Sequence, residues 1–139
     1  MLIDDFEMHQ RLFRSCAFDL PEHSLEGGEA VVFRSNQMQY SVVDIWLYSE
    51  MGKNHLMFWT ENDWNEIMIV KRTDFKYDKP LYEKDHKVSE LTEYFSYDGK
   101  AVVKYNSNRE KLNAPIDEQI IMQNERLLKS IRSKLGICK

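Results

Sequence analysis

Only two cysteines occur in the 139 residues, and they lie near opposite ends, at Cys16 and Cys138. We interpret them as two reduced thiols of a cytosolic protein, and a bridge that joins the two ends is the alternative. Long apolar runs are absent as well, whereas a transmembrane helix needs about 20 such residues in succession. Residues 1–5 include two aspartates and lack the basic and apolar regions of a secretory signal. These absences predict a cytoplasmic protein with no membrane partner.

The common motifs of catalysis and cofactor binding are also missing. There is no G-x-S-x-G sequence for a serine nucleophile and no phosphate-binding loop, and Gly27-Gly28 lies between glutamates that would repel a phosphate. A metal site needs several converging ligands, and no neighbours at such spacing accompany the four histidines, which are His9, His23, His55 and His86. We therefore predict a protein without a cofactor, a metal or an enzymatic activity.

The composition is that of an ordinary globular protein, with 42% apolar and 30% charged residues. Internal repeats and low-complexity segments are absent. A length of 139 residues suits a single domain, 1–139, and is enough to bury roughly two-thirds of the unfolded surface. A core of this size needs neither disulfides nor a metal to form.

The most informative stretch, from Tyr40 to Arg72, predicts three strands joined by two tight turns. Its longest strand, Tyr40 to Tyr48, has apolar side chains on both faces apart from Asp44, which indicates a central strand. Gly52 occupies the first turn, where we expect a positive φ. An antiparallel meander this aromatic buries one face and can present the other. It contains all three tryptophans: Trp46, Trp59 and Trp64.

Helices are predicted at both ends of the chain. Residues 2–18 have apolar side chains at roughly helical spacing, and Pro115 to Leu135 has a clear amphipathic pattern with Gly136 just past its end. The apolar stripe of the second helix should pack across the sheet.

The remaining segments complete the predicted fold. Residues 30–33 and 101–105 are short strands, and residues 73–86 mix charges and aromatics, which predicts an irregular excursion over the surface. A short helical stripe is formed by Val88, Leu91 and Phe95. The predicted fold class is therefore α+β: an antiparallel sheet of about five strands, a long C-terminal helix packed on one face and a short N-terminal helix.

Asp44 interrupts an apolar strand, and a buried carboxylate must find a partner or shift its pKa. We expect it to bond a residue on a neighbouring strand or to lie at a strand edge. A second interpretation of the chain is a small ligand-binding or enzymatic domain with a pocket between the sheet and the C-terminal helix, where Asp44 and His55 would converge. A third is a subunit that self-associates through the outer face of the meander. The methionines that could line the pocket are Met38, Met51, Met57 and Met68.

The net charge of −4 is unevenly distributed along the chain. Residues 1–98 carry 19 acidic and 10 basic side chains, whereas residues 99–139 carry 4 and 9. Four of these nine basic residues lie along the C-terminal helix, where a solvated face is expected, and the acidic chain as a whole argues against a nucleic-acid partner. The asymmetry can instead mark a face that binds a protein with a basic surface.

Aromatic residues near turns mark the predicted interface, because tyrosine and tryptophan are favoured at protein interfaces. They alternate with carboxylates over residues 61–98, which hold ten acidic and six basic side chains. We expect Trp64 and Tyr77 to be packed anchors and the carboxylates to pair with lysines and arginines of the partner. The predicted interface residues are Glu61, Asp63, Trp64, Asp74, Tyr77, Asp78, Glu83 and Asp85.

In style the chain resembles the immunity proteins of bacterial polymorphic-toxin and contact-dependent growth inhibition systems. The resemblance lies in the aromatic meander Trp46–Glu61, the acidic segment Asp74–Asp85 and the helix Pro115–Leu135, without a shared motif. It implies a small, acidic, cytoplasmic protein that binds a cognate toxin domain, frequently a basic nuclease, and blocks it without chemistry of its own. No site residue is transferred from the family.

Overall fold

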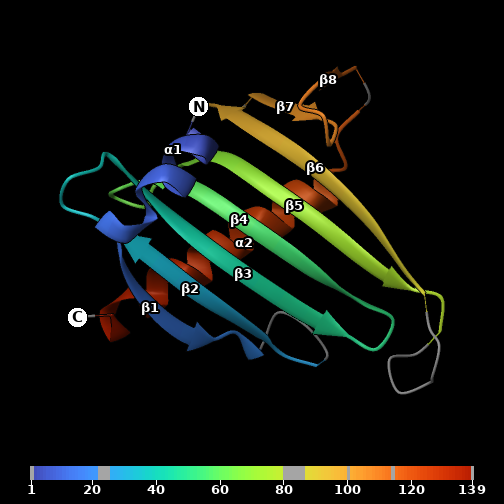
Figure 1. Ribbon diagram of the computed structural model, residues 1–139, viewed down its shortest axis with the longest axis horizontal. Coiled ribbons are helices and arrows are strands. Elements are labelled where there is room, and N and C mark those ends of the chain that lie inside the picture. The colour runs from blue at the N-terminus through green and yellow to red at the C-terminus, as the bar shows by residue number, and fades with distance from the viewer. Residues whose placement is uncertain (1, 22–25, 80–86, 100, 114, 139) are drawn as a thin grey trace.

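Alternating side chains and short hairpins build one antiparallel sheet, in which each strand pairs with the next strand of the chain (Figure 1). Our computed structural model describes residues 2–21, 26–79, 87–99, 101–113 and 115–138. Within these residues the sheet has eight strands: β1 (Arg14–Asp19), β2 (Gly28–Arg34), β3 (Tyr40–Ser49), β4 (Gly52–Glu61), β5 (Ile67–Tyr77), β6 (Val88–Asp98), β7 (Ala101–Tyr105) and β8 (Lys111–Leu112).

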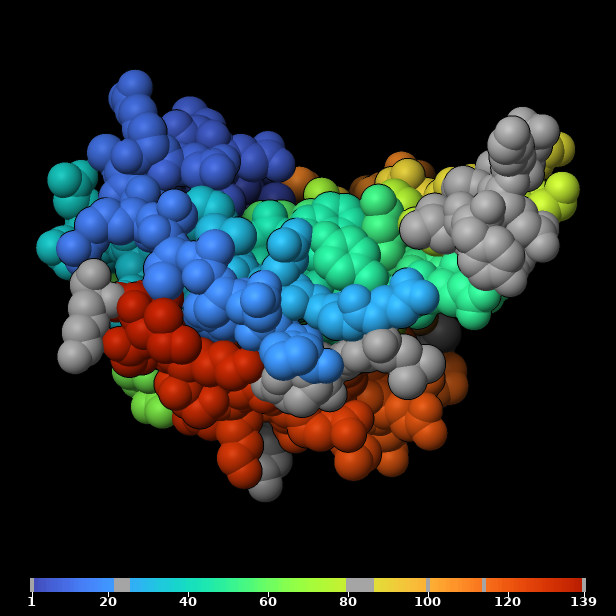
Figure 2. All heavy atoms as spheres, turned by 90° about the horizontal axis from the view of Figure 1, so that it is seen from below, coloured from blue at the N-terminus to red at the C-terminus, as the bar shows by residue number. Residues whose placement is uncertain are grey.

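Helices lie on both faces of this sheet, so the molecule has three layers. Helix α1 (Leu2–His9) and the 3₁₀ turn η1 (Gln10–Leu12) lie on one side, which we call the α1 face. Helix α2 (Glu118–Lys134) and the 3₁₀ turn η3 (Leu135–Ile137) cross the opposite side, the α2 face (Figure 1). Figure 2 shows the layers edge-on, with the blue N-terminal segment above the sheet and the red C-terminal helix below it.

Helix α2 forms where the sequence predicts a long C-terminal helix. Asp117 caps its start by accepting a hydrogen bond from the backbone N–H of Gln119 at 2.9 Å. Its buried side chains pack on the strands, and these are chiefly Leu127, Leu128 and Ile131. The α+β class and the helices at the two ends therefore agree with the prediction.

The predicted count of about five strands is wrong, because eight strands form. Residues 14–19 make the edge strand β1 instead of extending the N-terminal helix, which ends at His9. The apparent helical stripe of Val88, Leu91 and Phe95 belongs to strand β6. Val88 and Leu91 are 51% and 56% exposed, so their spacing does not mark a core-facing helix.

The expected irregular excursion over residues 73–86 is also wrong where the structure describes it. Strand β5 continues to Tyr77 and pairs with both β4 and β6 along this length. Charged side chains are tolerated here because neighbours satisfy them. Asp74 pairs with Arg72 on the same strand and accepts a hydrogen bond from Asn54 on β4, and Arg72 donates to Gln123 on α2. Residues 80–86 lie outside the described residues.

An apolar cluster covers each face of the sheet. On the α2 face, Val43, Ile45 and Leu56 pack beneath α2 and are fully buried. On the α1 face, Phe6 packs edge-on against Trp59, with 6.4 Å between ring centroids. This second cluster occupies only part of its face, because α1 is short.

The meander from Tyr40 to Arg72 is confirmed as strands β3, β4 and β5. A two-residue turn joins β3 to β4, so Ser49 pairs with Gly52. The same register places Trp46 directly opposite His55.

The expected positive φ at Gly52 is wrong, because the positive-φ glycines of the described residues are Gly27 and Gly99. Gly52 is needed for a different reason. A Cβ at this position would overlap the backbone carbonyl oxygen of Phe75 on the neighbouring strand.

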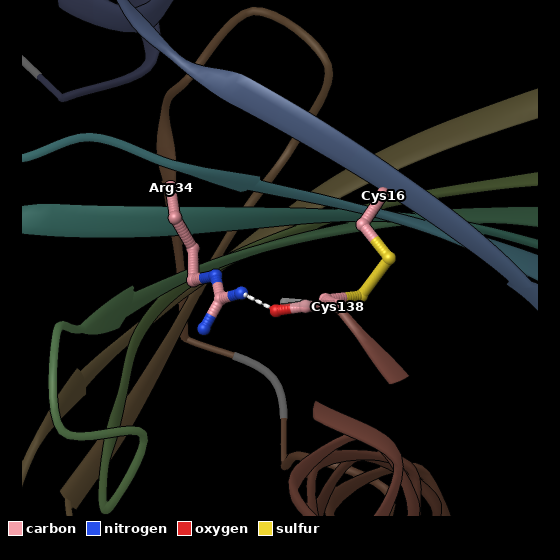
Figure 3. Close-up of a disulfide and its surroundings, with 3 residues drawn as sticks. All are labelled: Cys16, Arg34 and Cys138. Carbon is pink, nitrogen blue, oxygen red and sulfur yellow. Dashed lines mark hydrogen bonds between the residues drawn. A yellow bond between two sulfur atoms is a disulfide. The ribbon is translucent and has the colours of Figure 1, made fainter. Parts of the chain in front are cut away.

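The two cysteines form a disulfide, with Cα atoms 5.6 Å apart (Figure 3). The interpretation as two reduced thiols is therefore wrong for this structure, and the alternative bridge is present. It joins residues 122 positions apart because α2 leads the chain back to the edge strand β1 (Figure 1). Arg34 on β2 donates a hydrogen bond from Nη2 to the carbonyl oxygen of Cys138 (Figure 3).

Candidate functional site

The α1 face carries a group of half-buried rings beyond the area that α1 covers. They come from the adjacent strands β3, β4 and β5, where alternate side chains share one face. In Figure 2, side chains of the green strands lie open beside the blue N-terminal segment. We call this group the ring platform, and its members are Trp46, Tyr48, His55 and Phe75.

Trp46 lies at the centre of the ring platform. Its ring stacks on His55, with centroids 4.1 Å apart and planes 11° from parallel, and it stacks at longer distances with Phe75 and Tyr48, 5.9 and 6.5 Å away. The ammonium of Lys53 lies 5.0 Å from the Trp46 centroid and 5.1 Å from that of Phe75. Both distances suit a cation–π interaction. The rings are therefore ordered before any partner arrives.

A carboxylate orients the histidine of this group. Oδ1 of Asp44 lies 2.6 Å from Nε2 of His55, and the two side chains are 28% and 19% exposed. The expectation that Asp44 bonds a residue on a neighbouring strand is thus confirmed. The pair fixes the His55 ring beneath Trp46.

A second carboxylate borders the platform at Tyr48. The Tyr48 hydroxyl donates a hydrogen bond of 2.8 Å to Oε1 of Glu29. Burial, together with this bond to a negative group, raises the pKa of Tyr48 to about 12. The phenol therefore stays protonated and keeps donating at physiological pH.

The α2 face contains a groove of about 790 Å³ between the N-terminal half of α2 and the sheet. Nε of Arg72 donates to both carboxylate oxygens of Asp74, at 3.1 and 3.2 Å. Nη1 of Arg72 donates to Oε1 of Gln123 on α2, at 2.7 Å. Asn54 also donates to Asp74 through its amide nitrogen. This network ties the sheet to the helix and makes the groove polar.

The groove lies where the second interpretation expects a pocket, but its lining differs. Asp44 and His55 belong to the α1 face, so they cannot converge there. Met51 lines the groove, whereas the α1-face cluster takes the other candidates, Met38, Met57 and Met68. Across the described part of the chain, no group of three or more His, Cys, Asp or Glu side chains could hold a metal.

The predicted interface residues fall into two groups at opposite ends of β5. Glu61 ends β4, Asp63 and Trp64 lie in the turn between β4 and β5, and the two carboxylates are exposed. Trp64 is only 4% exposed and packs in the α2-face core, with a left-handed φ of 63°. Its ring is therefore not available as an anchor for a partner.

The second group lies about 30 Å away, because β5 has 11 residues and a strand rises about 3.3 Å per residue. Asp74 faces the groove, Tyr77 is half-buried, and Asp78 is exposed and accepts a hydrogen bond from the backbone N–H of Lys87 at 2.6 Å. The predicted positions Glu83 and Asp85 lie outside the described residues. The described members of the predicted interface thus do not form one surface.

The sequence did not predict the ring platform, although it predicted the aromatic meander that supplies most of the rings. A two-residue turn after Ser49 sets the register that brings Trp46 opposite His55. The sequence places Gly52 in a tight turn but does not fix the length of that turn, so the pairing stays undetermined. Phe75 joins the group only because β5 extends past its predicted end.

No protein-family model matches the chain, and no curated protein or solved structure matches it either. Among the described helices, none has the length and apolar character needed to cross a membrane. The ring platform and the groove are therefore the features from which a function can be inferred.

Proposed function

We propose that this protein binds another protein and neutralises it, as the immunity proteins of bacterial toxin systems do, and that the ring platform is the centre of its interface. The observation that carries the proposal is the stack of half-buried rings around Trp46 on a part of the sheet that α1 leaves open. Contiguous apolar patches on a surface mark interaction sites, and aromatic residues dominate the energies of interfaces. Because these rings are already ordered, binding immobilises little that was free.

The groups around the rings favour a partner with a basic surface. Asp44 and Glu29 border the platform, and the net charge of the chain is −4. Lys53 already places an ammonium over the rings of Trp46 and Phe75, which a lysine or arginine of a partner could replace or join. A cognate toxin domain with a basic active site, such as a nuclease of a contact-dependent growth inhibition system, has this chemistry.

The exposed carboxylates of the predicted interface have a different role in this proposal. Glu61, Asp63 and Asp78 lie in turns or at strand ends. Charges outside the packed centre of an interface chiefly raise the association rate. No catalytic step is part of the proposed function.

Trp46→Ala is expected to weaken binding to the partner by about 30-fold or more, because truncating a central aromatic anchor costs about 2 kcal/mol or more. A candidate toxin domain taken from a neighbouring open reading frame is produced together with the wild-type or variant protein, and cell growth is measured. The affinity of the purified pair is then measured directly. Wild-type protein restores growth, and the variant does not.

Leu91→Ala is the matched control for this experiment. Leu91 is 56% exposed and pairs with Asp74, which places it on the α2 face, away from the rings. The comparison requires that the wild type and both variants unfold cooperatively. Equal losses of affinity in the two variants, or wild-type affinity for Trp46→Ala, would contradict the proposal.

We also propose a cytoplasmic location, which requires the disulfide to be open in the cell. Cytosolic thiol systems keep cysteines reduced, and disulfides persist mainly in oxidising compartments. Alkylation of intact cells at the moment of lysis should then label both Cys16 and Cys138, and the bond should close in the purified protein. Cells in which the two cysteines resist labelling until a reductant is added would place the protein in an oxidising compartment instead.

A further inference from the structure

The groove on the α2 face is a second feature, distinct from the ring platform, although Lys53 and Phe75 border both. We propose that it binds a small polyanion whose carboxylate or phosphate groups contact the guanidinium of Arg72, with Lys76 and Arg126 at the rim. All three cations line the groove, and its volume of about 790 Å³ lies within the roughly 300–1,000 Å³ typical of small-molecule sites. The proposal goes beyond partner binding, because the two features lie on opposite faces of the sheet.

Arg72 is held in place and still has donors to offer. A guanidinium carries five N–H groups, and contacts with Asp74 and Gln123 use the one on Nε and one on Nη1. No hydrogen bond within the described residues uses Nη2, so the outer end of the group keeps donors for a planar oxyanion. The side chain is 11% exposed, and a hydrogen bond made in such a partly desolvated place is stronger than one made in water.

The two carboxylates of the groove are already engaged. Asp74 accepts hydrogen bonds from Arg72 and Asn54. Asp117 accepts the backbone N–H of Gln119 as the N-cap of α2. Their negative charge is thus offset by an arginine in one case and by the positive end of a helix in the other.

The cations at the rim are not engaged in this way. Lys76 on β5 and Arg126 on α2 are exposed, and neither forms an ion pair within the described part of the chain. They line the same groove from the sheet and from the helix. In a protein with a net charge of −4, this local excess of positive charge is what would hold a polyanion.

Isothermal titration of the purified protein with citrate and, separately, with inorganic pyrophosphate at constant ionic strength tests the proposal. We expect one saturable site for at least one probe. Lys76→Gln and Arg126→Gln should each weaken binding about tenfold, because each removes one charge-assisted interaction. The tighter of the two probes distinguishes a carboxylate ligand from a phosphate ligand.

Arg72→Lys tests the contribution of the Arg72 guanidinium to polyanion binding. The variant keeps a positive charge beside Asp74 and removes the planar group that can donate two parallel hydrogen bonds. It should also lose about tenfold in affinity. Lys129→Gln is the matched control, since Lys129 lies on the same helix, carries the same charge and does not line the groove. Non-saturable heats with both probes, or a loss for Lys129→Gln equal to that for Arg126→Gln, would overturn the proposal. Arg126→Gln should still neutralise the protein partner, so the two sites are tested separately.

Discussion

Replacing Trp64 by alanine is expected to lower the free energy of unfolding by about 4 kcal/mol, as the loss of a buried aromatic side chain does in a well-packed core. The ring is 4% exposed and belongs to the α2-face cluster that contains Ile67 and Leu127. Urea unfolding followed by circular dichroism measures the change. A large loss of stability would show that Trp64 serves the core and not an interface.

Two further variants separate the ring from its backbone. Trp64 has a left-handed φ of 63°, which costs a non-glycine residue about 1 kcal/mol or more. Trp64→Gly should therefore be more stable than Trp64→Ala, an order opposite to that in ordinary strands. Trp46→Ala, on the open face, should lose much less stability than either. Wild-type stability for Trp64→Ala would contradict the core role of this ring.

Replacing Cys16 by serine is expected to lower the free energy of unfolding of the oxidised protein by about 5 kcal/mol. The bond closes a loop between residues 122 positions apart, and the chain-entropy model assigns about this value to a loop of such length. The end of α2 loses its covalent link to β1 at the same time. Chemical denaturation of the oxidised wild type and of the variant measures the difference.

The two cysteines offer their own controls. Cys138→Ser should lose as much stability as Cys16→Ser, and the double variant should lose no more than either, because all three remove one bond. Wild-type protein treated with a reductant should match them. Additive losses in the double variant would show that the thiols act through packing and not through the bond.

Local signals sufficed for the elements whose determinants lie close together in the chain. The amphipathic pattern from Pro115 to Leu135 predicts α2 because a period of 3.6 residues is a local property. The alternation of Val43, Ile45 and Leu47 with Trp46 predicts a strand in the same way. These segments were predicted with nearly correct bounds.

Segments whose side chains are satisfied by distant partners were misread. Asp74 suggested an irregular, charged segment, yet it pairs with Arg72, which also donates to Gln123, 51 residues from Arg72. Val88 and Leu91 have the spacing of a helical stripe, although both side chains are exposed. The spacing alone does not show whether a side chain is buried, because burial depends on the neighbouring strands. The strands beyond the predicted five were therefore not predicted from the sequence.

The candidate site also depends on residues that lie far apart in the chain. Trp46 and Phe75 lie 29 positions apart and meet through the pairing of three strands, so neither position predicts the other. Trp64, in contrast, is an aromatic residue in an acidic turn, and only the tertiary structure shows that its ring packs in the core.

The sequence by itself determined the α+β class, the central meander and the C-terminal helix, since periodicity and capping act over a few residues. Only the tertiary structure decided the eight-stranded count, the bond between Cys16 and Cys138, and which rings are open to a partner. The physical reason is that strand pairing and burial join residues tens of positions apart, and no local pattern records which of the possible pairings buries the most apolar surface.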